Sequence, residues 1–341
     1  MGANNNMAAQ PIEIYRSVGY NNTTALEPGT GITFSIVGST ATFDTDLADT
    51  IGVGDAIQYD SDGNISIDAI AFIHQRTSSR EYIVKSASGG LPTSRASALS
   101  NFSIFRAYTS LNNAAGTTVG TENTGIAAAV VNFDTTSSRD IVTNNEKWFF
   151  ALYADANHAA SFTQNEWITS ATNNKTFFTP YLSSHVGISQ RHDGSWDSSK
   201  FHITPGDYAG NIFYFENNTN VIGIQIHMTE ENSGRTALIN EYTDNVTVKI
   251  SHNIIKKTAG GGNNIGIYVS ALNANIPNVS IYNNIIYGFD EAGSGGIYLG
   301  PGYGSKLGNF YVYNNTIYGC KNGIYESNDA TNILKNNISY N

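Results

Sequence analysis

Four similar segments near the C-terminal end of this 341-residue chain constrain its fold more than any other feature. They read VKISHNIIKKT (248–258), VSIYNNIIYGF (279–289), YVYNNTIYGC (311–320) and ILKNNISYN (333–341). In each, alternating apolar residues lead into an Asn, and successive Asn positions are 31, 31 and 22 residues apart. Repeats at such a period indicate stacked units, because one unit is too small to bury its own apolar face.

The repeated segments favour β-strands over helices. They are rich in Val, Ile, Tyr and Thr, and Gly or Asn interrupts each apolar run. Val248 and Ile250 alternate with polar residues, which is typical of a strand with one buried face. A second phrase, Gly-Ile-Tyr, recurs between the segments at 266–268, 296–298 and 323–325. Each repeat therefore predicts short strands, an Asn bend and a Gly-rich loop.

The Asn that ends each segment is interpreted as architectural. Asn tolerates left-handed backbone angles, and its amide can hydrogen-bond to the backbone of a turn. We expect the stacked amides to form a hydrogen-bonded ladder from one repeat to the next. The members of this ladder are Asn253, Asn284, Asn315 and Asn337.

The repeat pattern resembles the right-handed parallel β-helix superfamily, which includes pectate lyases, polygalacturonases, alginate epimerases and phage tailspikes. The resemblance is clear over 220–341 and extends back to about residue 145. Through IYRSVG (14–19) and HVGISQRHDGSWDSSKFH (185–202), a larger part of the chain is similar to uncharacterised bacterial and phage β-helix repeat proteins. This resemblance implies an all-β fold built as a right-handed parallel β-helix, or solenoid. The motifs NTD…DD…GHG, RxPxxR and DPHE are absent, so no catalytic residue carries over from the enzyme families.

The first part of the chain predicts a separate β-domain. Short strands are expected at 32–36, 40–43, 55–59, 69–74 and 81–85, with turn residues between them. Their spacing predicts a small antiparallel β-domain over 11–93, after a leader or disordered segment at 1–10. The β-helix would then occupy 145–341.

Residues 94–144 are expected to connect the two parts as a helical cap. The apolar spacing in 95–115 predicts an amphipathic helix, and a second short helix is expected over 124–133. As the resemblance implies, such a helix would cover the first rung of the coil and its unpaired backbone edge.

Composition excludes some partners. With a net charge of −10, nucleic acid is not expected to bind, because phosphate binding needs clustered Lys and Arg. No run of about 18 apolar residues is present, so membrane insertion is not expected either. The single Cys320 excludes an intramolecular disulfide and is expected to be a small buried side chain.

The two ends of the chain suggest where the protein works. Residues 1–10 show no signal peptide, yet the resemblance implies an extracellular, cell-surface or virion location. The chain stops just after a rung, and an uncovered rung has an open edge. We therefore expect either a longer natural chain or self-association through this C-terminal rung.

The segment 60–68 suggests a cation site. Asp60, Asp62, Asn64 and Asp68 offer oxygen atoms at spacings that resemble the start of a calcium loop. The motif is incomplete, because the Gly is at the fourth position and the twelfth position is Ala71. The alternative is an Asp-Gly hairpin turn between two strands. Ca²⁺ is the one cofactor that the sequence suggests.

The polar segment 185–202 is the first candidate for chemistry. His192 is a candidate general base, Arg191 would neutralise a uronic-acid carboxylate, and Trp196 would stack on a sugar ring. Asp197 and Lys200 are candidate substrate ligands on the same loop. Alternatively, the segment is a long ordered loop with Trp196 packed on the coil and its charges solvated.

A second candidate lies on neighbouring repeats. His227 and His252 are 25 residues apart, close to one repeat, so they are expected near each other on one face. Glu230, next to Glu231, is a candidate catalytic carboxylate of a hydrolase, and Arg235 is a candidate substrate ligand. Alternatively, these residues are solvated surface charges.

Two functional hypotheses follow. The first is an extracellular protein that engages a polysaccharide or cell-surface glycan, with polysaccharide lyase or glycoside hydrolase activity left open. The second is a non-catalytic structural or adhesive protein, such as a tailspike-like receptor-binding fibre of a phage. An enzyme should show a groove with a His or Lys and an acid within hydrogen-bond reach, whereas a fibre should show flat faces and self-association.

Overall fold

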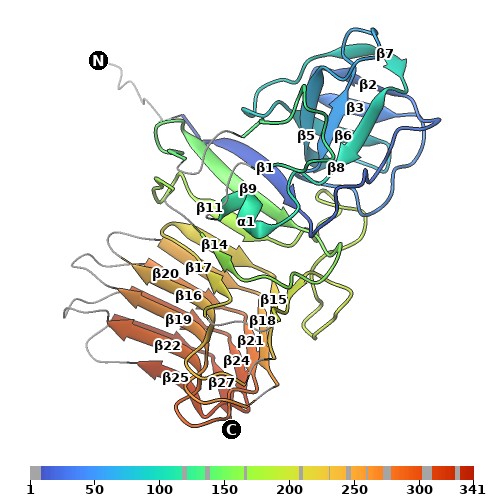
Figure 1. Ribbon diagram of the computed structural model, residues 1–341. Helices are drawn as coiled ribbons and strands as arrows, with labels where there is room; N and C mark the ends of the chain where they lie inside the picture. Colours follow the sequence, from blue (N-terminus) through green and yellow to red (C-terminus); the bar gives the residue numbers. More distant parts are fainter. Residues whose placement is uncertain are drawn as a thin grey trace, which may run out of the picture.

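The computed structural model describes residues 9–116, 121–134, 139–164, 167–206, 210–229, 231–242, 247–258, 260–271, 278–301, 309–326 and 331–341. Over these residues the chain forms three parallel sheets, one antiparallel sheet and one short helix (Figure 1). The predicted all-β class is therefore confirmed, and a small antiparallel β-domain is present.

The three parallel sheets are stacks of short strands. The first parallel sheet has the order β1 (Ile12–Val18), β9 (Glu146–Leu152), β11 (Lys175–Phe178), β14 (Thr219–Ile222), β17 (Thr247–Ser251), β20 (Asn278–Tyr282), β23 (Asn309–Tyr313) and β26 (Thr331–Lys335). The second contains β10 (Phe162–Thr163), β13 (Phe213–Tyr214), β16 (Thr236–Tyr242), β19 (Ile265–Ala271), β22 (Gly295–Pro301) and β25 (Asn322–Glu326). The third contains β12 (His202–Ile203), β15 (Gln225–Met228), β18 (Ile254–Lys257), β21 (Ile285–Tyr287), β24 (Thr316–Tyr318) and β27 (Ile338–Tyr340).

One sequence repeat corresponds to one turn of the chain. From β14 onward the chain enters the first, third and second sheets in turn, and each sheet gains a strand per turn. Matching apolar side chains therefore stack in columns inside the molecule. Such columns are Val221, Ile250, Ile281 and Val312 in the first sheet, and Ile226, Ile255, Ile286 and Ile317 in the third. All of them belong to one continuous core, as stacked units require.

The predicted Asn ladder is confirmed. The Asn284 Oδ1 accepts hydrogen bonds from the backbone N and the Nδ2 of Asn253, at 3.0 and 2.9 Å. The Asn284 Nδ2 donates to the Ile250 carbonyl, and Asn315 and Asn337 repeat this pattern on the following turns. Each ladder Asn follows a left-handed residue: His252, Asn283, Asn314 and Asn336 have φ of 58°, 56°, 56° and 53°.

The antiparallel sheet has seven strands. Their order is β7 (Arg95–Leu99), β2 (Phe34–Val37), β3 (Thr40–Phe43), β6 (Glu81–Lys85), β5 (Ala69–Arg76), β4 (Ala56–Tyr59) and β8 (Phe102–Phe105). The predicted strands from 32 to 85 are thus present within a few residues. Aromatic side chains such as Phe34, Phe43 and Tyr82 fill its separate core.

The predicted helices over 95–115 and 124–133 are wrong. The first part of segment 95–115 forms β7 and β8, and only α1 (Leu111–Ala115) is helical. The buried residues Phe102 and Ile104 have the spacing of a strand, whereas Phe102 and Phe105 have a helical spacing, and pairing with β4 selects the strand. Residues 124–133 form turns instead. The short α1 packs on β1 and β10, at the start of the parallel stack.

Buried charges join the antiparallel sheet to the parallel stack. Strand β1 precedes the antiparallel sheet in sequence but pairs with β9 in the first parallel sheet. Its Arg16 contacts Asp134 through two N–O distances of 2.6 Å. Arg106 contacts Asp55, before β4, and Asp155, after β9, at 2.8 Å each. The domain boundaries suggested by the sequence stay predictions, but the parallel stack includes β1 as well.

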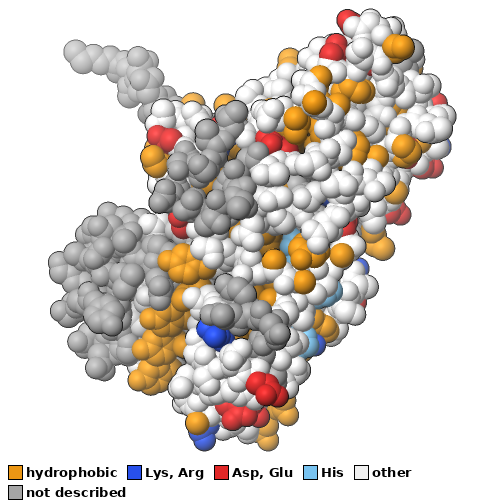
Figure 2. All heavy atoms as spheres, in the orientation of Figure 1, with side chains coloured by type: hydrophobic (Ala, Val, Ile, Leu, Met, Phe, Trp, Pro, Cys, Tyr) orange, Lys and Arg blue, Asp and Glu red, His pale blue; other side chains and the backbone are white. Residues whose placement is uncertain are grey.

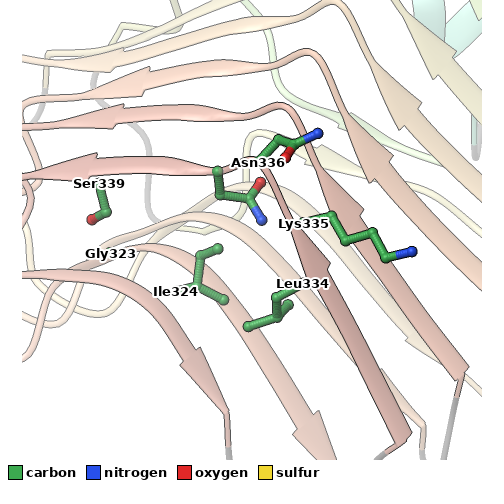
Figure 3. Close-up of a pocket in the computed structure, with 7 residues that line it drawn as sticks. Gly323, Ile324, Leu334, Lys335, Asn336 and Ser339 are labelled. Atoms are coloured by element: carbon green, nitrogen blue, oxygen red, sulfur yellow. The ribbon is translucent and has the colours of Figure 1, made fainter.

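The last turn of the stack leaves part of the core accessible. A hollow of about 480 Å³ lies there, and Figure 3 shows Ile324, Leu334 and Ser339 around it. Leu334 extends the column of Val312 and is 47 % exposed. One turn earlier Cys320 is buried, as predicted. Over the described residues, no helix has the length and apolar character needed to cross a membrane.

Candidate functional site

A hollow of about 340 Å³ lies on the outer face of the first parallel sheet (the Arg191 hollow). Its floor comes from outward positions of β1, β9 and β11, where Tyr15, Phe149 and Thr176 are neighbours in register. Its wall contains Tyr181, His185, Arg191, His252 and Tyr282. The loop after β11 carries three of these wall residues, and its His185 carbonyl accepts a hydrogen bond from Val53 of the antiparallel domain. The hollow therefore lies where both parts of the fold meet.

Arg191 is the cation of this hollow. Its Nε donates to the Thr179 Oγ1 at 3.1 Å, and its Nη2 donates to the Thr179 carbonyl at 3.3 Å. The guanidinium lies 3.9 Å from the centre of the Tyr181 ring and covers Gly223, where a Cβ would collide with it. Burial lowers the pKa of Arg191.

Arg191 has no acidic partner among the described residues, since none of the ion pairs there includes it. A guanidinium has five N–H donors, and the Thr179 contacts use two of them. A half-buried cation with donors to spare is suited to an anionic ligand.

Burial favours the neutral form of two histidines beside Arg191. Burial lowers the pKa of both His185 and His252, and the charge of Arg191 lowers it further. The His252 Nε2 lies 3.1 Å from the Asn283 Nδ2 and accepts its hydrogen bond. These imidazoles offer polar edges to a ligand without adding positive charge.

The predicted base His192 lies next to the hollow but not in its lining. Its Nε2 is 2.7 Å from the His252 carbonyl oxygen, to which it donates. Its Nδ1 accepts a hydrogen bond from the Gly194 backbone at 3.2 Å. Burial lowers the pKa of His192, which favours this neutral form with both ring nitrogens hydrogen-bonded. The ring thereby ties the loop to the bend at His252, and its role as a base stays a prediction.

Trp196 lies in a different cluster, on the outer face of the third parallel sheet. Its ring meets His202 and His227 edge to face, with centroids 5.8 and 5.4 Å apart. The Lys256 Nζ lies 3.9 Å from the centre of the Trp196 ring. One face of the indole is therefore covered by a cation, so the predicted sugar stacking has at most the other face.

The other predicted residues of this loop hold it in place. The Asp197 backbone and the Gln225 side chain exchange two hydrogen bonds of 2.8 Å. The Asp197 carboxylate accepts hydrogen bonds from Ser199, and the Lys200 Nζ donates to the Ser189 carbonyl at 2.7 Å. Their substrate-binding roles stay predictions.

His227 and His252 occupy different elements. His227 on β15 is in register with Lys256, and its Nε2 lies 2.7 Å from the Thr258 Oγ1. Burial lowers the pKa of His227 to about 4. His252 instead lies in the bend before β18, against Tyr282. A spacing of 29 residues, rather than 25, brings side chains into register between these two turns, so the two rings are not stacked neighbours.

The remaining candidates are a predicted substrate ligand, Arg235, and a predicted catalytic carboxylate, Glu230. The Arg235 backbone donates to the Asn264 Oδ1 at 2.8 Å, at the start of β16, and Arg235 does not line the Arg191 hollow. Glu230 lies outside the described residues.

The suggested calcium loop folds as a hairpin connection between β4 and β5, in which Tyr59 pairs with Ala69. Carboxylate oxygens of Asp60, Asp62 and Asp68 lie within 4.8 Å of one another. Asp60 accepts hydrogen bonds from the backbone of residues 62, 63 and 65, and an ion pair of 3.3 Å joins it to Arg95.

The other oxygen ligands of this loop are also engaged. Asp62 and Asn64 accept hydrogen bonds from residues two positions later in the chain, and Asp68 accepts from Ser61. With a guanidinium already against Asp60, these residues fit Ca²⁺ poorly. Calcium binding stays a prediction.

Sequence reasoning missed the aromatic floor of the Arg191 hollow. Tyr15 and Phe149 stack with ring centroids 4.5 Å apart, although they are distant in sequence. The signal that could have found them is the shared alternation of β1 and β9, whose register aligns the two rings.

Comparisons of the chain with protein-family models, with curated proteins and with solved structures gave no match.

Proposed function

We propose that the protein is an extracellular right-handed parallel β-helix protein that binds an acidic polysaccharide in the Arg191 hollow. The observation that carries the proposal is the half-buried guanidinium of Arg191 without a carboxylate partner among the described residues. Burial of a cation without a counter-charge costs free energy, which a bound anion offsets. A uronic-acid carboxylate matches the fork of a guanidinium.

The rest of the lining suits a sugar. Tyr15, Tyr181 and Tyr282 bring phenol groups to the hollow, which can exchange hydrogen bonds with sugar hydroxyls. A cavity of about 340 Å³ whose walls combine aromatic rings with polar groups is within the usual size range of ligand sites. Because Tyr15 and Phe149 cover each other's faces, the floor presents ring edges rather than an open stacking platform.

The proposal is binding without cleavage. No Asp or Glu is among the described residues that line the hollow, so the carboxylate pair of a hydrolase is missing there. A lyase would need a base near the sugar. Both ring nitrogens of His192 are engaged, and the Nε2 of His252, which lines the hollow, accepts a hydrogen bond from Asn283.

The fold supports a rigid adhesive role as a second candidate function. Tyrosines stack along the outer faces of the sheets: Tyr268 on Tyr298 and Tyr298 on Tyr325, with centroids 5.0 Å apart in each pair. Figure 2 shows hydrophobic side chains as a band over β16, β19, β22 and β25. An adhesin would bind the polysaccharide and release no product, so this candidate is compatible with the first.

Arg191→Ala should weaken binding of a uronate oligosaccharide by about tenfold or more, measured by titration calorimetry, since a charge-assisted hydrogen bond contributes about 1.5–3 kcal/mol. The affinity of Arg191→Lys should lie between those of the wild type and Arg191→Ala, because an ammonium group keeps the charge but loses the two-pronged geometry of the guanidinium. Arg80→Ala is the matched control, since Arg80 is exposed and pairs with Asp46 away from the hollow.

Melting temperatures of the variants close to that of the wild type would show that the fold is retained. Equal affinity of Arg191→Ala and wild type for the uronate, or equal affinity of the wild type for uronate and neutral oligosaccharides, would contradict the proposal. The same solutions are assayed for unsaturated products and reducing ends. Steady product formation would show that the protein is a lyase or a hydrolase rather than a binding protein.

A further inference from the structure

A second hollow, of about 780 Å³, lies on the outer face of the first parallel sheet (the lysine hollow). Lys85 from β6, Lys147 from β9 and Lys249 from β17 line it. Glu13 is the one acid in the described lining, and its carboxylate lies 3.7 Å from His74. Over the described residues, no ion pair includes any of the three lysines. Three cations from both parts of the fold therefore share this lining with a single carboxylate, that of Glu13.

The lysine hollow and the Arg191 hollow are neighbours on the same strands. On β1 and β9, Glu13 and Lys147 line the lysine hollow, and the next outward residues, Tyr15 and Phe149, line the other. The Lys147 Nζ lies 5.1 Å from the centre of the Phe149 ring, so a side chain of one hollow reaches a ring of the other. The two hollows are therefore adjacent along the strands, and together they are called the furrow.

Lys147 and Arg191 mark the two ends of this furrow, whereas Lys249 is in register with Thr176 of β11, between them. Asn174 lines the lysine hollow just before β11, and Thr179 holds Arg191 just after it. At about 3.3 Å per residue, this stretch of strand is roughly 16 Å long. A ligand that meets both ends must therefore be an extended chain with more than one anionic group.

We propose that the lysine hollow is a second anion subsite for the same acidic polysaccharide, whose chain lies along β9 and β11 between Lys147 and Arg191. This inference rests on the proposed function of the Arg191 hollow. The three ammonium groups repel one another in the free protein, and carboxylates of the polysaccharide relieve that repulsion. Ammonium groups act as hydrated point charges, so this subsite tolerates variation in the sugar more than Arg191 does.

The test compares uronate oligosaccharides of two lengths by titration calorimetry. The double variant Lys147→Gln/Lys249→Gln should bind a uronate octasaccharide about tenfold more weakly than the wild type. Its affinity for a uronate disaccharide, which occupies the Arg191 hollow alone, should be unchanged. Lys321→Gln is the matched control, because this exposed lysine precedes β25 of the second sheet and should bind both probes like the wild type.

Three results would overturn the inference. In the first, the double variant binds the octasaccharide as tightly as the wild type, while Arg191→Ala still binds it more weakly. This result removes the second subsite and leaves the proposed function standing. In the second, the double variant binds the octasaccharide more weakly, while Arg191→Ala binds it like the wild type. This result contradicts the proposed function, and with it the inference that both hollows bind one ligand. If inorganic sulfate binds the wild type as tightly as the octasaccharide, the lysine hollow is a site for free anions.

Discussion

At the residue scale, the ladder asparagines link each turn of the chain to the next. Asn284 is 1 % exposed, and its amide accepts two hydrogen bonds from Asn253 and donates one to Ile250. The position before each ladder Asn needs only a left-handed backbone. Asn314, which precedes the ladder residue Asn315, provides it with φ of 56°. Adjacent asparagines in the same repeat therefore have different physical roles.

Asn284→Ala should lower the free energy of unfolding by about 2–4 kcal/mol, because buried N–H groups of Asn253 lose their acceptor. Asn314→Gly, the control at a bend position, should change it by less than about 1 kcal/mol, since Gly adopts positive φ readily. Urea unfolding of both variants measures the difference. Similar losses in the two variants would show that the ladder adds nothing beyond the bend.

The same scale explains what the sequence could and could not predict. The ladder was predictable because Asn253, Asn284 and Asn315 recur with a local signature. Arg191 was identified as a cation for a sugar acid, but Trp196, only five residues later, packs on another sheet. Proximity in sequence grouped them, whereas a turn of the loop separates them in space.

At the element scale, β11 carries a lysine into the core. Lys175 is 0 % exposed, at an inward position between Trp148 and Thr219 of the neighbouring strands. Its Nζ lies 3.3 Å from the Glu216 carboxylate. Burial lowers the pKa of Lys175 to about 8, although Glu216 opposes the shift.

This shift predicts a pH dependence of stability. Above pH 8 the folded protein has lost the Lys175 proton, whereas the unfolded chain, with a pKa of 10.5, still binds it. The wild type should therefore gain about 1.4 kcal/mol per pH unit relative to Lys175→Met between pH 8 and 9.5. Urea unfolding at pH 7.5, 8.5 and 9.5 measures this difference. Parallel pH profiles for the two proteins would contradict the assigned pKa.

Elements were predictable where pairing is local. The predicted strands 40–43 and 81–85 agree with the observed β3 and β6, each of which forms a hairpin with the strand before it, β2 and β5 respectively. By contrast, β1 pairs with β9 across the whole antiparallel domain, and β8 becomes a strand only through β4. Neither pairing leaves a signal within a short window, so the aromatic floor of the Arg191 hollow and the strands within 95–105 were missed.

At the scale of the whole molecule, buried charges couple the antiparallel sheet to the parallel stack. Arg106 is 1 % exposed and binds Asp55 on one side and Asp155 on the other, with Tyr153 packed 3.5 Å from the guanidinium. Burial raises the pKa of Asp55, and Arg106 opposes that shift. Removal of the guanidinium leaves a buried carboxyl group without its partner.

Arg106→Met should lower the free energy of unfolding by about 3–5 kcal/mol. Hydrogen exchange should accelerate together in β4 and β9, because the lost contact belongs to both parts. Arg80→Met removes an exposed ion pair and should cost less than about 1 kcal/mol. Faster exchange in β4 with unchanged exchange in β9 would show that the two parts unfold independently.

The stacking of single turns also determines how the molecule bears a mechanical load. Backbone and Asn-ladder hydrogen bonds between turns all point along the stack, from β1 toward β27 (Figure 1). Tension between the two ends loads these bonds in line, so a pulled molecule would peel open one turn at a time. A load along the strands is carried by covalent backbone instead. A polysaccharide in the furrow along β9 and β11 would thus pull in the direction in which the molecule is stiffest.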